Sequence, residues 1–274
     1  MPVTVFFIGS LSAVSFLTAW LSLLIYRCLP DSWVCDFNES PGPVHRSDNR
    51  CPRRRLSLFC MSAAVFFLML LKIRGISLDP SGPAAEGKCA LSSLPFWECV
   101  FFILSALILL PAALSDIDYY IIPDQICVLT AAAALLNGVI QEAGQGTGSL
   151  SADEAVSFIL SSSGLLSAFL LPAAGGLLCG FLMLLSCGLS RLFSGKEGVG
   201  MGDVKLMTAC GALASSAAGQ ETWAAASLSV FVVAVMSSAV WFSILLLSGR
   251  VSYGEACPLA PWIVLSSLLV LALF

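Results

Sequence analysis

Two short acidic segments carry the residues of this sequence that could do chemistry. Asp203 lies in the glycine-rich segment 195–205, and Asp116 lies in the segment 115–124, which reads Ser-Asp-Ile-Asp-Tyr-Tyr-Ile-Ile-Pro-Asp. Each segment follows a long apolar run. A carboxylate at the centre of a membrane helix costs about 2.5–3.5 kcal/mol, and less near the interface, so such acids usually face a watery cavity or a partner.

Two carboxylates that share one site could hydrolyse a peptide bond. Their mutual repulsion lets the pair hold a single proton near neutral pH. The ionised partner can then deprotonate a water molecule for attack on a peptide carbonyl, while the protonated partner supports the developing oxyanion. Asp116 and Asp203 therefore predict a proteolytic pair that needs no metal ion and no cofactor.

The residues around Asp203 have two interpretations. Gly198, Gly200 and Gly202 lack a Cβ atom, so the backbone could adopt unusual conformations and let an extended substrate approach. Alternatively, the segment is a loop in which Asp203 caps the start of a helix, where a carboxylate satisfies exposed N–H groups. Lys205 could favour the charged form of Asp203, or it could anchor the chain at the membrane face.

The elements that position these acids are predicted to be membrane helices. The chain of 274 residues is 58% hydrophobic and 11% charged, with a mean hydropathy of +0.94, which is typical of a polytopic membrane protein. We expect an all-α fold of one membrane domain, and residues 3–26 read as a retained helix rather than a signal peptide. Since about 20 apolar residues cross a bilayer, eight spans are expected, near 3–26, 57–74, 91–114, 125–141, 167–190, 204–218, 222–248 and 258–274.

The apolar stretch 155–193 is too long for one straight span. Pro172 and the pair Gly175-Gly176 could interrupt it, but we expect a single span with an interfacial lead-in, because serines dilute its first part. Gly176 and Gly180 form a small-xxx-small pattern that lets helices approach closely.

Basic residues predict the orientation of the spans. With eight spans, ten of the 13 Lys and Arg residues fall on one side, and Lys72, Arg74 and Lys88 fall on the other. The first side is therefore predicted to be cytoplasmic. Two spans separate Asp116 from Asp203, so both acids are expected at that cytoplasmic face.

The glycine-rich segment resembles the GxGD signature of bacterial type IV prepilin peptidases over residues 195–206, Gly-Lys-Glu-Gly-Val-Gly-Met-Gly-Asp-Val-Lys-Leu. Asp116 stands eight residues before Asp124 of an Ile-Pro-Asp turn, which resembles the first aspartate motif of that family. The family's opening and closing helices are echoed by Ile8-Gly9-Ser10, Leu24–Pro30 and Leu259–Trp262.

The resemblance implies an intramembrane aspartic endopeptidase of the bacterial cytoplasmic (inner) membrane. Asp116 and Asp203 would be the catalytic dyad, and Gly200, Gly202 and Lys205 would serve substrate binding. The substrates would be type IV prepilins or type II secretion pseudopilins, whose short basic leader is cut at the cytoplasmic face. The expected partners are these substrates and the lipid bilayer; no basic run interleaved with aromatics predicts nucleic-acid binding.

Asp118 and Asp124 lie close enough to Asp116 to compete for the first catalytic role. Because both are carboxylates of an exposed loop, they are expected to be solvated or to cap a helix.

The sequence departs from the family in the segment 28–55, which we expect to be a cytoplasmic loop. Bifunctional prepilin peptidases carry a zinc-binding insert with two Cys-x-x-Cys pairs and also methylate the new pilin N-terminus. Here Cys28, Cys35, Cys51 and Cys60 are widely spaced and no Cys-x-x-Cys exists. A structural zinc site normally requires close-spaced ligand pairs, so no metal is expected and N-methyltransferase activity is doubtful.

Two other functions use the same acids. A signal-peptide-peptidase-like or presenilin-like GxGD protease also pairs two aspartates, but Asp116 does not follow a tyrosine and the Ile-Pro-Asp turn is a prepilin-peptidase feature. A transporter or channel could instead use Asp116 and Asp203 to bind a proton or a cation.

Overall fold

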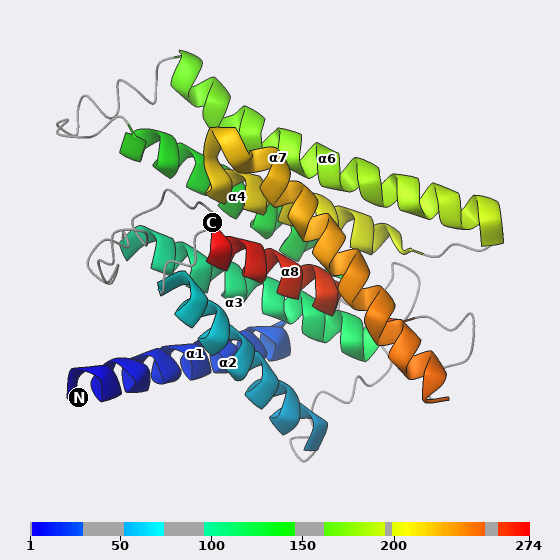
Figure 1. Cartoon of the computed structure of the whole chain (residues 1–274), viewed down its shortest axis with the longest axis horizontal. Helices are drawn as coiled ribbons and strands as arrows, with labels where there is room; N and C mark the ends of the chain where they lie inside the picture. The colour runs from blue at the N-terminus through cyan, green and yellow to red at the C-terminus, as the bar shows by residue number, and fades with distance from the viewer. Residues whose placement is uncertain (1, 30–51, 74–95, 146–161, 195–198, 250–256) are drawn as a thin grey trace. The chain divides into compact units, whose positions relative to one another are not determined.

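The computed structural model describes residues 2–29, 52–73, 96–145, 162–194, 199–249 and 257–274 of the chain. These residues form seven helices (Figure 1), and five of the helices are long and apolar enough to cross a membrane. The prediction of a helical membrane protein is therefore confirmed. The described residues divide into two compact units, 1–123 with 272–274, and 124–271. That the chain is one membrane domain stays a prediction.

The first unit contains α1 (Pro2–Cys28), α2 (Pro52–Ile73) and α3 (Phe96–Tyr119). α1 packs against both other helices. Lys72 at the end of α2 forms a salt bridge of 3.3 Å with Glu98 in the first turn of α3. In the predicted orientation, Lys72 lies on the side of the membrane that carries only three basic residues. The ion pair gives Lys72 a local partner on that side.

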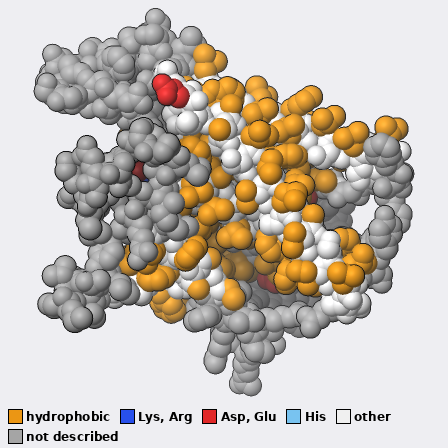
Figure 2. All heavy atoms as spheres, viewed as in Figure 1, with side chains coloured by type: hydrophobic (Ala, Val, Ile, Leu, Met, Phe, Trp, Pro, Cys, Tyr) orange, Lys and Arg blue, Asp and Glu red, His pale blue; other side chains and the backbone are white. Residues whose placement is uncertain are grey.

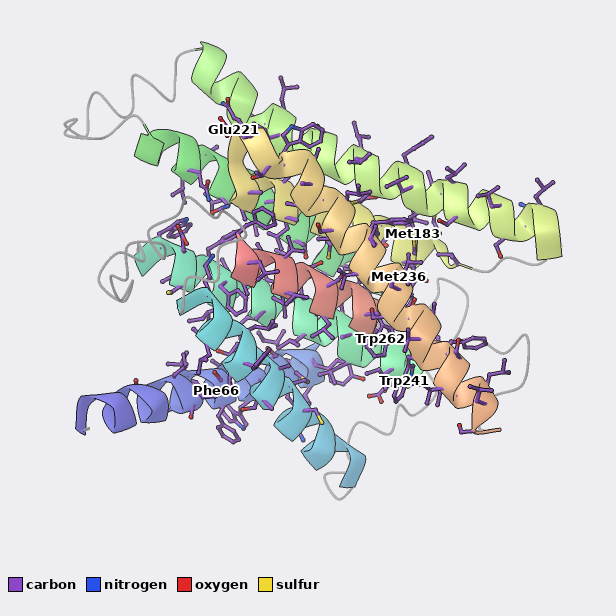
Figure 3. All side chains as sticks on the ribbon, in the orientation of Figure 1. Phe66, Met183, Glu221, Met236, Trp241 and Trp262 are labelled. Carbon is purple, nitrogen blue, oxygen red and sulfur yellow. The ribbon has the colours of Figure 1, made fainter. Side chains whose placement is uncertain are left out.

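The second unit contains α4 (Asp124–Gln145), α6 (Ser162–Ser194), α7 (Met201–Leu247) and most of α8 (Ala260–Leu273). α4, α6 and α7 pack against one another. Trp241 on α7 and Trp262 on α8 lie beside each other with ring centroids 5.8 Å apart (Figure 3). Large apolar side chains on α6 and α7, such as Leu177, Leu192 and Leu247, are exposed, and apolar atoms cover most of the described surface in Figure 2. Such a surface suits a lipid environment.

The count of about eight spans is not confirmed. Two of the expected spans, 204–218 and 222–248, belong to the single element α7, and two others correspond to helices whose apolar parts are short, Cys60–Leu70 in α2 and Ala260–Leu273 in α8. α3 also extends beyond its predicted end at residue 114 and includes both Asp116 and Asp118. The helix therefore continues past the end of the uninterrupted apolar run, which hydropathy alone does not reveal.

α7 is broken at Gly219, where the backbone is not helical (φ 73°, ψ −176°). This combination of angles is essentially restricted to glycine. The two halves then contact each other, since the Ser227 hydroxyl in the second half donates a hydrogen bond of 3.2 Å to the Gly211 carbonyl in the first. Figure 1 shows the second half turning back at this point, and Glu221 marks the turn in Figure 3. α7 is thus a helical hairpin.

α6 continues through Pro172 and the two following glycines as one helix of 33 residues. The expectation of one uninterrupted helix here is confirmed, while its expected lead-in, residues 155–161, lies outside the described residues. The small-residue pattern also packs as expected. A Cβ on Gly176 would lie 3.0 Å from the Thr208 carbonyl of α7, and one on Gly180 would collide with the Thr208 hydroxyl.

Candidate active site

Asp203 lies in the first turn of α7, three residues after the helix N-cap Gly200. The Gly200 N–H donates a hydrogen bond of 3.2 Å to Asp203 Oδ2, and Asp203 Oδ1 is buried. This is one half of a capping box, so the helix-capping interpretation of Asp203 is confirmed. Capping does not exclude catalysis, because the same hydrogen bond fixes the direction of the carboxylate.

The glycines before Asp203 differ in their surroundings. Gly200 has an ordinary extended backbone (φ −72°, ψ 151°), so it is not required for an unusual conformation. A Cβ at Gly200 would instead lie 3.3 Å from Asp203 Oδ2, which would crowd the carboxylate. Gly202 lies in the first turn of α7, and Gly198 lies outside the described residues.

Lys205 forms an ion pair with Asp124, the first residue of α4. Its Nζ atom donates to both carboxylate oxygens of Asp124 at 2.8 Å. The two residues are 81 positions apart in the sequence. Asp124 lies in the first turn of α4, so its role as a helix cap stays a prediction, and its partnership with Lys205 was not predicted.

Asp116 lies in the last turn of α3 and is buried, with 5% of its surface exposed. The backbone around it is tightly held. The Tyr120 N–H donates to the Asp116 carbonyl at 2.9 Å, and the buried Ser115 hydroxyl donates to the Ile121 carbonyl at 2.8 Å. Tyr120 has a positive φ of 56°, a conformation that is uncommon for a bulky residue and that ends the helix in the manner of a C-terminal cap.

Asp118 accepts a hydrogen bond of 2.7 Å from the hydroxyl of Tyr26. Tyr26 is buried near the end of α1, and Asp118 is exposed near the end of α3. The exposure of Asp118 agrees with the expectation of a solvated carboxylate, while its hydrogen bond with a tyrosine of α1 was not predicted. A signal was available in the sequence, since Tyr26 lies in the segment Leu24–Pro30 that resembles the family's opening helix.

The structure thus brings together two pairs that flank the predicted catalytic acids. Asp124 meets Lys205 within the second unit, and Asp118 meets Tyr26 within the first. Asp116 and Asp203 belong to different units. Their joint catalytic role stays a prediction.

No group of three or more His, Cys, Asp or Glu side chains among the described residues could hold a metal ion. Cys28 and Cys60 are described as free, exposed thiols. Cys35, His45 and Cys51 lie outside the described residues, as does most of the predicted loop 28–55.

Comparison with known proteins assigns the family. The sequence model of the type IV leader peptidase family matches residues 101–247, which is more than half of the 274-residue chain and encloses Asp116, Asp124, Asp203 and Lys205. Comparison with curated proteins and with solved structures finds no match. The matched region together with the long apolar helices shows that this chain is a membrane-embedded peptidase and belongs to the type IV leader peptidase family.

Proposed function

We propose that the protein is an intramembrane aspartic endopeptidase with Asp116 and Asp203 as its catalytic dyad. The observation that carries this proposal is the family match over residues 101–247, which contains both acids. Each acid also lies at the end of a long apolar helix, in the last turn of α3 or the first turn of α7. An acid in such a position can reach water while the rest of its helix remains in lipid.

The helix ends suggest different roles for the two acids. Asp203 lies at the N-terminus of α7, where the positive end of the helix dipole stabilises negative charge, whereas Asp116 lies at the C-terminus of α3, where the dipole opposes it. We therefore propose that Asp203 is the ionised base and Asp116 carries the shared proton. Asp203 would take a proton from a water molecule while the oxygen of that water attacks the peptide carbonyl. Asp116 would donate its proton to the developing oxyanion. On collapse of the tetrahedral intermediate the C–N bond breaks, Asp203 would pass its proton to the leaving amine, and Asp116 would take back a proton from a hydroxyl of the intermediate as the carbonyl forms again, which restores the dyad.

The proposed substrates are type IV prepilins or type II secretion pseudopilins, cut after their short basic leader at the cytoplasmic face of the inner membrane. A basic leader would stay on the cytoplasmic side, as the positive-inside rule requires, while the hydrophobic segment that follows lies in the bilayer. Gly200 and Gly202 would leave room for the extended backbone at the scissile bond. N-methyltransferase activity is not part of the proposal.

Sequence separation supports a common site for the two acids. Asp124 follows Asp116 by eight residues, and its carboxylate pairs with Lys205, two residues after Asp203.

We also propose that the two halves of α7 cross the membrane separately. With α2 and α8 counted as spans, the chain would then have the expected eight passes.

The experiment is leader cleavage in membranes by the wild type and by Asp116→Asn and Asp203→Asn, with protein levels measured in parallel. We expect each replacement to abolish cleavage without loss of protein, because neither Asn can exchange the shared proton. Glu221→Gln is a matched control, since it removes an exposed acid from α7 without touching the dyad. Full activity of either Asp variant would contradict the proposal. Cleavage of signal peptides instead of prepilins, or ion flux without any cleavage, would favour the other two functions.

A further inference from the structure

We propose that Asp124 and Lys205 are positioning residues whose ion pair sets the rotation of α7, and thereby the direction in which Asp203 points. This inference rests on the proposed function, because it concerns the same catalytic site. It differs from the sequence-based hypotheses, in which Lys205 either acts on Asp203 by its charge, contacts substrate, or anchors the chain at the membrane.

The geometry of α7 separates Lys205 from Asp203. Successive residues of an α-helix are rotated by about 100°, so residues two apart project about 200° from each other. Lys205 faces α4 and reaches both oxygens of Asp124 at 2.8 Å. Asp203 therefore projects from the opposite side of the same turn. Any rotation of α7 that broke the ion pair would also turn the Asp203 carboxylate.

A second contact makes this rotation well defined. Further along the same two helices, the buried Asn137 side chain of α4 donates to the Ser216 carbonyl and hydroxyl of α7 at 3.1 and 3.3 Å. Asp124 and Asn137 are 13 residues apart on α4, and Lys205 and Ser216 are 11 apart on α7. The two helices thus run in the same direction and are joined at two points. The contact between Asn137 and Ser216 fixes the spacing of the two helices. The ion pair between Asp124 and Lys205 fixes the rotation of the first turn of α7 about the helix axis.

The ion pair is poorly placed to contribute to global stability. Its side chains are 48% and 62% exposed, and exposed pairs contribute little to the free energy of folding because solvent screens them. Variants that lack the pair should therefore fold. A loss of activity in such variants would report on the site rather than on the amount of folded protein.

The first experiment measures leader cleavage by Asp124→Asn, Lys205→Met and the double variant. We expect each single change to lower kcat by about 3- to 30-fold, the range expected for coupling through a contact, with KM changed by less than about twofold. The double variant should be no worse than either single variant, because all three lack the same interaction. The exchanged variant Asp124→Lys/Lys205→Asp should recover activity, because it restores an ion pair between the same two positions. The recovery should be only partial, because a lysine at the N-terminus of α4 is unfavourable to the helix dipole.

Matched controls are Lys72→Met and Glu98→Gln, which break the salt bridge between α2 and α3 and should leave kcat unchanged. The positioning role would be overturned by additive losses in the double variant or by an exchanged variant no more active than either single one. It would also be overturned by a rise in KM alone, which would indicate substrate binding by Lys205. A displaced midpoint of the pH–rate profile in Lys205→Met would show instead that the ammonium acts directly on the charge of Asp203.

The second experiment does not depend on activity. A carbodiimide couples a lysine amine to a carboxylate in contact with it, forming an amide as the reagent takes up the elements of water. In membranes that contain the wild-type chain, mass spectrometry should find a peptide joining Lys205 to Asp124, and Asp124→Asn should lack it. Absence of this crosslink in a chain that cleaves leaders would overturn the ion pair and the positioning role, and would leave the proposed function standing. Absence of cleavage by the wild type would overturn the proposed function and the positioning role, whereas the crosslink would still report the pair.

Discussion

Asp203 and Asp116 are both held by their own local backbone, but in different ways. The side chain of Asp203 is tied to the Gly200 N–H, so the carboxylate itself is oriented. At Asp116 the main chain is held, by the Tyr120 N–H and by the hydrogen bond from the Ser115 hydroxyl to the Ile121 carbonyl. Preorganisation of the Asp203 carboxylate, and of the backbone that carries Asp116, reduces the entropy that must be lost to reach a reactive geometry. The residues that bracket each acid are therefore as informative as the acids themselves.

Gly200→Ala tests how closely the carboxylate of Asp203 is fitted to its surroundings. The new Cβ would lie 3.3 Å from Oδ2, so one of the two must move by a few tenths of an ångström. Because small misplacements of reacting groups can cost up to about 100-fold in rate, we expect kcat for leader cleavage to fall by about 3- to 10-fold.

The control is Gly188→Ala on α6, where a Cβ would meet nothing within 4 Å. This variant should cleave leaders like the wild type. Equal activity of both variants with the wild type would show that Gly200 is not needed to accommodate Asp203.

The break at Gly219 makes the 47 residues of α7 a helical hairpin instead of one long helix. The non-helical backbone at Gly219 interrupts the helical hydrogen bonding, and a buried carbonyl without a partner would cost about 1–3 kcal/mol. The amide of Asn137 donates to the Ser216 carbonyl at this point. Asn137 is itself 1% exposed, so a polar side chain inside an apolar helix has a clear structural reason.

Asn137→Leu should therefore destabilise the protein by about 1–3 kcal/mol, because the Ser216 carbonyl loses its buried donor. The measurement is equilibrium unfolding in detergent micelles. Thr130→Val is a matched control on the same helix, because Thr130 is buried and its hydroxyl bonds only locally, to the Ile126 carbonyl. If the two variants lost the same stability, the amide would not be stabilising the break.

At the scale of the whole molecule, the hairpin in α7 predicts where the connecting segments lie. If the two halves cross the membrane separately, the break at Gly219 lies on the opposite side from the segment 195–198 that precedes Met201. Because α6 connects the segments 146–161 and 195–198 and is expected to cross the membrane once, the segment 146–161 is expected on the same side as the break at Gly219.

Epitopes inserted after residue 148, after residue 196 and after Gly219 should therefore differ in protease sensitivity in spheroplasts. We expect cleavage at the first and third positions and protection at the second, because residues 195–198 adjoin the face with most basic residues. Detergent permeabilisation is the control, since it should expose all three. Protection of the Gly219 epitope would show that α7 does not cross twice.

Much of this protein was predictable from consecutive residues. Hydropathy alone indicates an all-helical membrane protein, because the bilayer demands apolar runs of defined length. The glycine-rich segment and the Ile-Pro-Asp turn predict the family, which the match over 101–247 confirms. Helix ends were predicted less well, since α3 extends through Asp116 and Asp118, and a polar residue does not by itself end a helix.

Only the tertiary structure decided which distant residues meet. Tyr26 and Asp118 are 92 positions apart, Asp124 and Lys205 are 81 apart, and Asn137 and Ser216 are 79 apart. None of these pairings follows from local spacing, because each depends on how the helices are rotated and aligned when they pack. The sequence by itself therefore determined the class of protein and the candidate acids, whereas packing decided which side chains hold the turns on which those acids lie.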